Sequence, residues 1–303
     1  MRRDIQNIID KYIKRVEKYI ADNEGNYNTD ILEQIVINLY KELKDVLSEN
    51  YTIANYQYKE LILEIKIMYN LLDELGIRNS KKMFNDNTIG ENKADIKTRL
   101  FMMFVKTIGE IVFLLEGGYS PCAISRIRYI YEIGVILEFI NKDNNEFSKR
   151  YFYISERSRI NMAREFGDSD LIKRIKDVKK GIISSNKYEK NYSWAKNITN
   201  KEQSTFKEIA YLSRYKDIYP IYIESSWYVH ADIYGSLVSI DRKTDEPIST
   251  WNTEPSKYGT EKVIKYLFLM FLDITNDYFD DVASALSIIN IIFIKIISEK
   301  VYK

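Results

Sequence analysis

The sequence contains very little cysteine and histidine, and this scarcity excludes several kinds of site. Its 303 residues include 1 Cys and 1 His. A single cysteine allows neither an internal disulfide nor a cysteine zinc site, and a single histidine excludes the common two-histidine metal sites. We therefore expect a protein that works without a metal ion or another cofactor.

Proline, glycine and net charge are also low. The 4 Pro and 11 Gly are few for this length and argue against an all-β or loop-rich fold. The 45 Lys and Arg residues balance the 44 Asp and Glu residues, so the total charge favours neither a nucleic-acid partner nor an acidic tail. With 45% hydrophobic and 29% charged residues, the chain has the composition of a globular protein with a large core.

The sequence lacks a long apolar run of the kind that crosses a membrane. Its most apolar stretch, residues 282–297, is short and carries Asn290 and Lys295, which favours an amphipathic core helix. The first residues, beginning Met1-Arg2-Arg3, are charged and lack the apolar centre of a signal peptide. We expect a cytoplasmic protein with no membrane partner.

Apolar residues recur at spacings of three and four along nearly the whole chain, which predicts an all-α, multi-helix bundle. The first three helices are expected at residues 3–21, 29–47 and 53–75. Gly76 is the expected stop of the third helix. These helices form a predicted N-terminal helical layer, residues 1–78. Residues 78–92 are polar and rich in asparagine, so we expect a loop there and a second domain at residues 92–303.

The second domain is expected to hold the remaining helices, at residues 94–116, 121–140, 145–166, 168 onward, 204–213 and 220–238. One or two further helices are expected at residues 260–301, with residues 277–281 as the joint between them. Gly117-Gly118 is a helix stop and Ser120-Pro121 a helix start, so the first two of these helices should form an antiparallel hairpin. Residues 241–259 hold Pro247 and Pro255 and predict a long surface loop, a kind that is usually functional or mobile.

The expected helix at 121–140 is apolar nearly all round, yet Ser125, Arg128 and Glu132 follow one stripe along it. Buried charge is costly unless it is paired and hydrogen-bonded. One interpretation is a structural Arg128–Glu132 ion pair that fixes the register of the helix. The other is a polar pocket in the bundle, where the charge serves a function. Arg126 lies on another, solvent-facing side of this helix.

A second polar stripe surrounds the one histidine. At helical spacing, Tyr219, Tyr222, Ser226, His230 and Tyr234 share one face. Histidine transfers protons more readily at neutral pH than any other side chain. The alternative is a core histidine that is hydrogen-bonded to Ser226 or a tyrosine. A Ser226 nucleophile is not expected, because no strained nucleophile turn surrounds it.

Other common motifs are missing or ambiguous. The sequence has no glycine-rich phosphate loop and no Glu-x-x-His pair of the di-iron bundles. Cys122, at a helix start, is interpreted as a small buried residue. Residues 173–180 are rich in lysine, and the helix at 145–166 carries several arginines interleaved with tyrosines. These cations form either a solvated face or an RNA-facing surface.

Three short motifs, in their order and spacing, resemble a family of uncharacterised bacterial helical proteins. The motifs are Gly-Tyr-x-x-x-Ala at residues 118–123, Arg-x-x-x-Glu at residues 128–132 and Ser-x-x-Val-His at residues 226–230. The resemblance covers roughly residues 101–237. This family looks like a relative of the HEPN helical bundles of toxin–antitoxin and phage-defence systems, many of which are metal-independent RNases.

The resemblance implies a HEPN-like four-helix core with a polar cleft lined by Arg128, Glu132, Ser226 and His230. It also implies a homodimer. Active HEPN nucleases have an arginine four to six residues before the histidine, whereas residues 224–229 of this chain include none. Arg128 would therefore have to supply the positive charge from another helix.

Two functions remain open at this point. The first is a metal-independent endoribonuclease, with His230, Arg128 and Glu132 as catalytic residues and Tyr222, Ser226, Arg126 and Tyr219 as RNA-binding residues. The second is a non-catalytic helical module that binds a protein, nucleotide or RNA partner within a defence system. The first predicts that Arg128 and His230 face solvent together, and the second predicts dry, fully packed side chains.

Overall fold

The computed structural model describes most of the chain. The described residues are 2–23, 28–48, 56–86, 89–142, 146–178, 192–201, 203–230, 240–241, 250–251, 259–279 and 285–301. Nearly all of them are helical, as predicted. The helices are α1 (Arg2–Asp22), α2 (Thr29–Ser48), α3 (Lys59–Asn85), α4 (Glu91–Glu116), α5 (Ser120–Lys142), α6 (Glu146–Glu165), α7 (Ser169–Val178), α8 (Lys196–Thr199), α9 (Phe206–Tyr211), α10 (Tyr219–Trp227), α11 (Thr260–Phe279) and α12 (Ala285–Val301).

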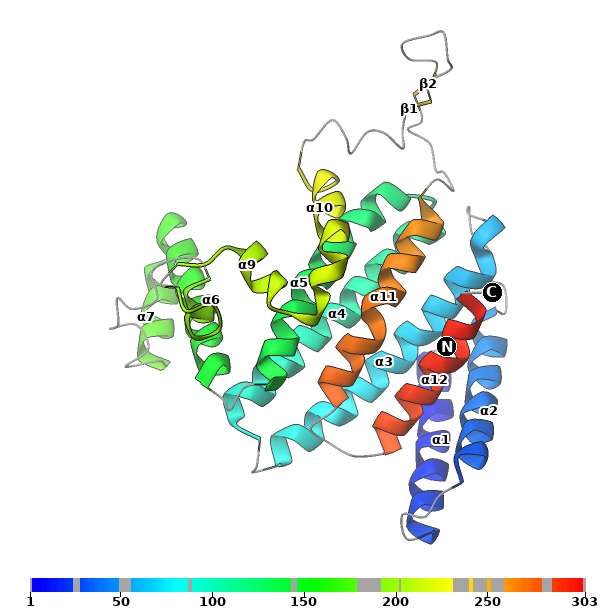
Figure 1. The fold of residues 1–303 in the computed structure, drawn as a ribbon. Helices are drawn as coiled ribbons and strands as arrows, with labels where there is room; N and C mark the ends of the chain where they lie inside the picture. The colour runs from blue at the N-terminus through cyan, green and yellow to red at the C-terminus, as the bar shows by residue number, and fades with distance from the viewer. Residues whose placement is uncertain are drawn as a thin grey trace.

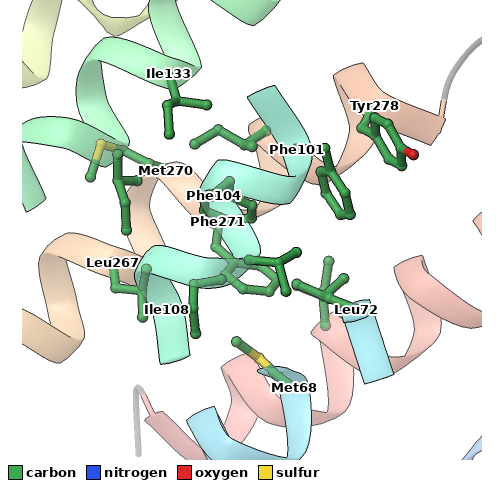
Figure 2. Packing of buried hydrophobic residues seen from close by; sticks show 14 of the residues in the cluster. Met68, Leu72, Phe101, Phe104, Ile108, Ile133, Leu267, Met270, Phe271 and Tyr278 are labelled. Atoms are coloured by element: carbon green, nitrogen blue, oxygen red, sulfur yellow. The ribbon is translucent and has the colours of Figure 1, made fainter. Parts of the chain in front are cut away.

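Helix α5 lies at the centre of the fold and packs against α4, α10 and α11 (Figure 1). Its apolar residues point in nearly every direction, so it has to be covered on several sides. Aromatic and aliphatic side chains of α3, α4, α5 and α11 interlock in the core (Figure 2). Phe101 of α4 and Tyr278 of α11 stack with their ring centroids 3.8 Å apart. This packing fixes α5, which carries the charged stripe.

The predicted hairpin of α4 and α5 is confirmed. Helix α4 ends in a Schellman turn, in which Tyr119 N–H donates to Leu114 C=O at 2.7 Å and Gly118 N–H donates to Leu115 C=O at 3.1 Å. Gly118 has a φ of 79°, a left-handed conformation that favours glycine. Helix α5 then begins at Ser120, whose buried hydroxyl lies 2.7 Å from the hydroxyl of Thr260 at the start of α11.

Two predictions about α3 were wrong. The helix passes through Gly76 and continues to Asn85, so most of residues 78–92 are helical. Gly76 is instead required by helix packing, because a Cβ atom there would stand 2.8 Å from Phe101 Cε1. The glycine lets the Phe101 ring of α4 lie directly on α3. A glycine in a helix therefore marked a close approach here and not a stop.

Helices α1, α2 and α12 lie together on one side of the core (Figure 1). The described part of the apolar segment, residues 285–297, lies in α12, as expected for a core helix, and Leu286, Ile289, Phe293 and Ile297 are buried. Because α12 also packs against α3, the end of the chain lies beside the N-terminal helices. The division into residues 1–78 and 92–303 stays a prediction.

The segment after α10 differs from the sequence prediction. The helix expected at 220–238 ends at Trp227, and Tyr228 to His230 form a turn. Residues 231–239, including Tyr234, lie outside the described residues. Strand β1 (Ile240–Asp241), at the start of the expected 241–259 loop, pairs in antiparallel fashion with strand β2 (Thr250–Trp251), near the middle of that loop. Among the described residues, no helix has the length and apolar character needed to cross a membrane.

Candidate functional site

Two elements far apart in the sequence, α5 and the segment around α10, build the candidate site (Figure 1). Ser213 caps a 3₁₀ turn, η4 (Arg214–Ile218), by accepting a hydrogen bond from Tyr215 N–H at 3.1 Å. The turn leads directly into α10, where Pro220 occupies the first helical turn. His230 follows the end of α10, and its N–H donates to Ser226 C=O at 3.1 Å. The imidazole thus extends from a short turn beside α5.

Arg128 contacts both His230 and Glu132. Its Nη1 lies 2.8 Å from His230 Nε2, and its Nε donates to Glu132 Oε1 at 3.1 Å. A guanidinium has only donors, so His230 Nε2 is the acceptor in this contact. The side chains of Arg128 and Glu132 are 24% and 29% exposed, and His230 is exposed. These three groups therefore meet where solvent reaches them.

The guanidinium of Arg128 lies over the ring of Tyr222. The Arg128 guanidinium carbon lies 5.0 Å from the centroid of the Tyr222 ring, within the range of a cation–π contact. Burial raises the pKa of Tyr222 to about 12, and the Glu132 charge adds to this effect while Arg128 opposes it. Burial alone would lower the pKa of Arg128, but the hydrogen bond and charge of Glu132 raise it. The guanidinium and the Tyr222 phenol therefore keep their charge states at neutral pH.

Three further tyrosines surround Glu132, and the sequence analysis did not place them in the site. Tyr129 precedes Glu132 by one turn of α5, Tyr151 comes from α6, and Tyr192 precedes α8. Burial raises the pKa of Tyr151 to about 12, with smaller contributions from Tyr129, Glu132 and Tyr192. Tyr129 could have been found from its spacing to Glu132, whereas Tyr151 and Tyr192 approach only through the tertiary fold.

The remaining predicted residues are placed less favourably. The Ser226 hydroxyl donates to Tyr222 C=O at 2.6 Å, so its proton serves the helix backbone and not the imidazole. Tyr219 is buried and stacks on Tyr222 with centroids 5.4 Å apart. Arg126 Nε lies 3.4 Å from Glu110 Oε2 on α4, away from the Arg128 contacts. Arg126 therefore does not join the group around Arg128, because it faces another side of α5.

Two other residues on α5 also differ from their predicted surroundings. Ser125 shares one stripe of α5 with Arg128, but its hydroxyl donates to the helix backbone, to Cys122 C=O at 2.6 Å. Cys122 itself is exposed, so the prediction of a small buried residue was wrong. In this first turn of α5, Ser120 and Ala123 are buried, whereas Cys122 faces solvent.

A buried polar network next to the site was missed entirely. Arg214 of η4 donates from its Nη2 to Asp277 Oδ1 of α11 at 3.0 Å, and its backbone N–H donates to Glu138 Oε2 of α5 at 2.9 Å. Asn141 Nδ2 donates to Asp277 Oδ1 at 3.4 Å, and Lys97 Nζ donates to Asn141 Oδ1 at 2.9 Å. Because η4 immediately precedes α10, this network fixes where α10 begins.

The lysine-rich segment falls largely outside the described side chains. Lys173 of α7 is exposed, while the side chains from residue 174 onward in this helix are not among those described. The part of the chain that the structure describes contains no group of three or more His, Cys, Asp or Glu side chains suited to a metal ion.

A family model described as a family of unknown function (DUF5677) matches residues 94–247. The matched segment runs from α4 past β1, so it contains α5, α10 and His230. Helices α1 to α3, α11 and α12 lie outside it. No curated protein and no solved structure matches the chain.

Proposed function

We propose that this chain, which belongs to the family of unknown function DUF5677, is a metal-independent endoribonuclease that acts in bacterial anti-phage defence or as a toxin. The proposal rests on one observation above all: Arg128 Nη1 approaches His230 Nε2 to 2.8 Å across 102 residues of sequence. This contact joins a proton-transfer group and a cation at a surface that solvent reaches. The defence role, a HEPN-like four-helix core and a homodimer are carried over from the resemblance to HEPN proteins.

RNA cleavage suits this small set of groups because RNA carries its own nucleophile, the 2′-hydroxyl. His230 Nε2 would accept the proton of the 2′-hydroxyl as the bond from O2′ to phosphorus forms. The bond from phosphorus to O5′ then breaks, and a proton passes from the imidazolium to O5′. The products are a 2′,3′-cyclic phosphate and a 5′-hydroxyl.

The contact between Arg128 and His230 gives the arginine two successive positions. In the free protein, Arg128 Nη1 donates to the lone pair of His230 Nε2, so Nε2 cannot accept another proton. An incoming phosphate attracts the Arg128 guanidinium. When the guanidinium moves away from His230, Nε2 is free to accept a proton. Glu132 contacts Nε, on the opposite edge of the guanidinium, and so leaves both Nη groups for the phosphate. Glu132 is a positioning residue in this scheme.

The alternative is the non-catalytic module, in which the same contacts are structural. It predicts dry, packed side chains, whereas Arg128 and Glu132 are partly open to solvent. This exposure favours the enzyme. Under the alternative, a partner from the same defence system would bind elsewhere on the surface.

The test is cleavage of total tRNA and of a structured RNA in EDTA. The wild-type protein is compared with His230→Ala and Arg128→Ala, and Arg126→Ala is the matched control. Arg126 belongs to the same helix and has its own acidic partner, but it does not contact His230. We expect cleavage by the wild-type and control proteins, none by His230→Ala, and a loss of at least about a hundred-fold in Arg128→Ala. Equal cleavage by all four folded proteins would refute the proposal.

A further inference from the structure

A row of aromatic rings leads away from the site along α10 and α9. Tyr222, beneath Arg128, stacks on Tyr219 with centroids 5.4 Å apart and ring planes inclined by 27°. Tyr219 in turn meets Tyr211, the last residue of α9, edge to face at 5.3 Å. Each ring contacts the next, so the row is continuous from the guanidinium to Tyr211. Its inner members are largely covered, whereas Tyr211 is 53% exposed.

Tyr211 is held in place, and a cation lies over its ring. Lys207 Nζ lies 5.6 Å from the centroid of the Tyr211 ring. Helix α9 is rigid at its start, because Thr205 and Glu208 form a capping box with reciprocal hydrogen bonds of 2.8 and 3.3 Å. Glu208 also pairs with Lys201, so the nearest carboxylate on α9 is already neutralised. The exposed ring therefore lies under one cation, Lys207, while Glu208 of the same helix is paired with Lys201.

We infer that Tyr211 and Lys207 form a stacking subsite for an unpaired base of a single-stranded RNA, next to the site of Arg128 and His230. Exposed aromatic rings bind the faces of bases, and nearby lysines bind the backbone, in proteins that hold single-stranded nucleic acids. A base in a duplex cannot present its face to the ring. The inference rests on the proposed function for its substrate, and it adds that the RNA must be unpaired close to the cleaved bond.

The test measures binding separately from cleavage. The ligand is a single-stranded 2′-O-methyl RNA, which lacks the free 2′-hydroxyl and stays intact, and the same sequence as a duplex serves for comparison. Tyr211→Ala is expected to weaken binding of the single strand about ten-fold, because stacking on one aromatic ring contributes about that much. Tyr211→Phe keeps the ring and should bind as the wild type does. Phe113→Ala, which removes an aromatic ring that is 75% exposed on α4, is the matched control and should also bind normally.

An abasic scan locates the stacked base. One position along the single strand should weaken wild-type binding when its base is removed, yet have no further effect on Tyr211→Ala. Such non-additivity shows that the ring and the base contact each other. Unchanged binding by Tyr211→Ala, or losses that add at every position, would overturn the subsite.

His230→Ala separates this inference from the proposed function. If this variant loses cleavage while Tyr211→Ala binds normally, only the subsite is wrong. If it still cleaves RNA, the proposed mechanism is wrong, whatever Tyr211 does. If the wild-type protein binds neither RNA, both are overturned.

Discussion

Replacement of Asp277 by asparagine should make the protein more stable at neutral pH. Asp277 is 3% exposed, and its Oδ2 has no hydrogen-bond partner among the described residues. Burial raises its pKa from the ordinary value of 3.8 to about 6; the Arg214 charge opposes this rise, while Glu138 adds to it. The pairing with Arg214 therefore does not fully offset the cost of burying the carboxylate.

The size and sign of the effect follow from this pKa. Because the pKa of Asp277 is higher in the folded protein than in the unfolded chain, the folded state binds more protons between about pH 4 and pH 6. Stability from this group is thus present at low pH and is lost as the pH rises through that window. At about 1.36 kcal/mol per pH unit, the full loss is about 3 kcal/mol. Asparagine resembles the protonated form and keeps an oxygen for the donors Arg214 and Asn141, so Asp277→Asn avoids this loss.

The assay is urea unfolding of the wild-type protein and Asp277→Asn at pH 7.5 and at pH 4. The variant should be more stable by about 3 kcal/mol at pH 7.5, and the two proteins should converge near pH 4. Asp273→Asn is the matched control, because Asp273 also faces Arg214, at 3.6 Å, but is 39% exposed. Its loss should change stability by less than about 1 kcal/mol. A strongly destabilised Asp277→Asn at pH 7.5 would refute the reasoning. It would show that the ion pair with Arg214 stabilises the protein by more than the free energy that desolvation of the Asp277 carboxylate costs.

Three further predictions concern packing and the site. Gly76→Ala should lower the unfolding free energy by about 1–3 kcal/mol in urea titration, because its Cβ would stand 2.8 Å from Phe101. An unchanged unfolding free energy would mean that the Phe101 ring moves aside freely. Glu132→Gln should keep the fold, as measured by circular dichroism. It should reduce RNA cleavage about ten-fold or more, since the neutral amide orients Arg128 less firmly. Full activity of this variant would exclude the positioning role of Glu132. Tyr222→Phe should retain most cleavage and Tyr222→Ala should lose it, because the ring makes the cation–π contact with Arg128; the reverse order would point to a proton transfer by the phenol.

Hydrophobic periodicity was sufficient to predict most of the helices and the α4–α5 hairpin, because amphipathic spacing and turn residues are local signals. Gly76 shows the limit of such signals, since a helix stop and a tight helix crossing both call for glycine. The distinction depends on Phe101, which comes from another helix. The end of α10 at Trp227 was missed for a similar reason: the Tyr219–His230 stripe keeps a helical spacing past the point where the helix ends.

The site was partly visible in the sequence. Arg128 and Glu132 are one helical turn apart, and histidine occurs once, so both halves could be found locally. Their contact across 102 residues could only be suggested by a resemblance. Tyr151 and Tyr192, and the network of Arg214, were not predictable, because each approaches α5 through the packing of other helices.

The chemical nature of the cleavage products tests the central claim most directly. A short single-stranded RNA with one cleaved position would be incubated with the protein in EDTA, and its ends would be identified by mass spectrometry. The same RNA with a single 2′-deoxy nucleotide at that position is the control. We predict a 2′,3′-cyclic phosphate and a 5′-hydroxyl from the wild-type protein, no product from His230→Ala, and no cleavage at the 2′-deoxy position. Cleavage at the 2′-deoxy position, or by His230→Ala, would contradict the account, because neither reaction could use the 2′-hydroxyl with His230 as its base.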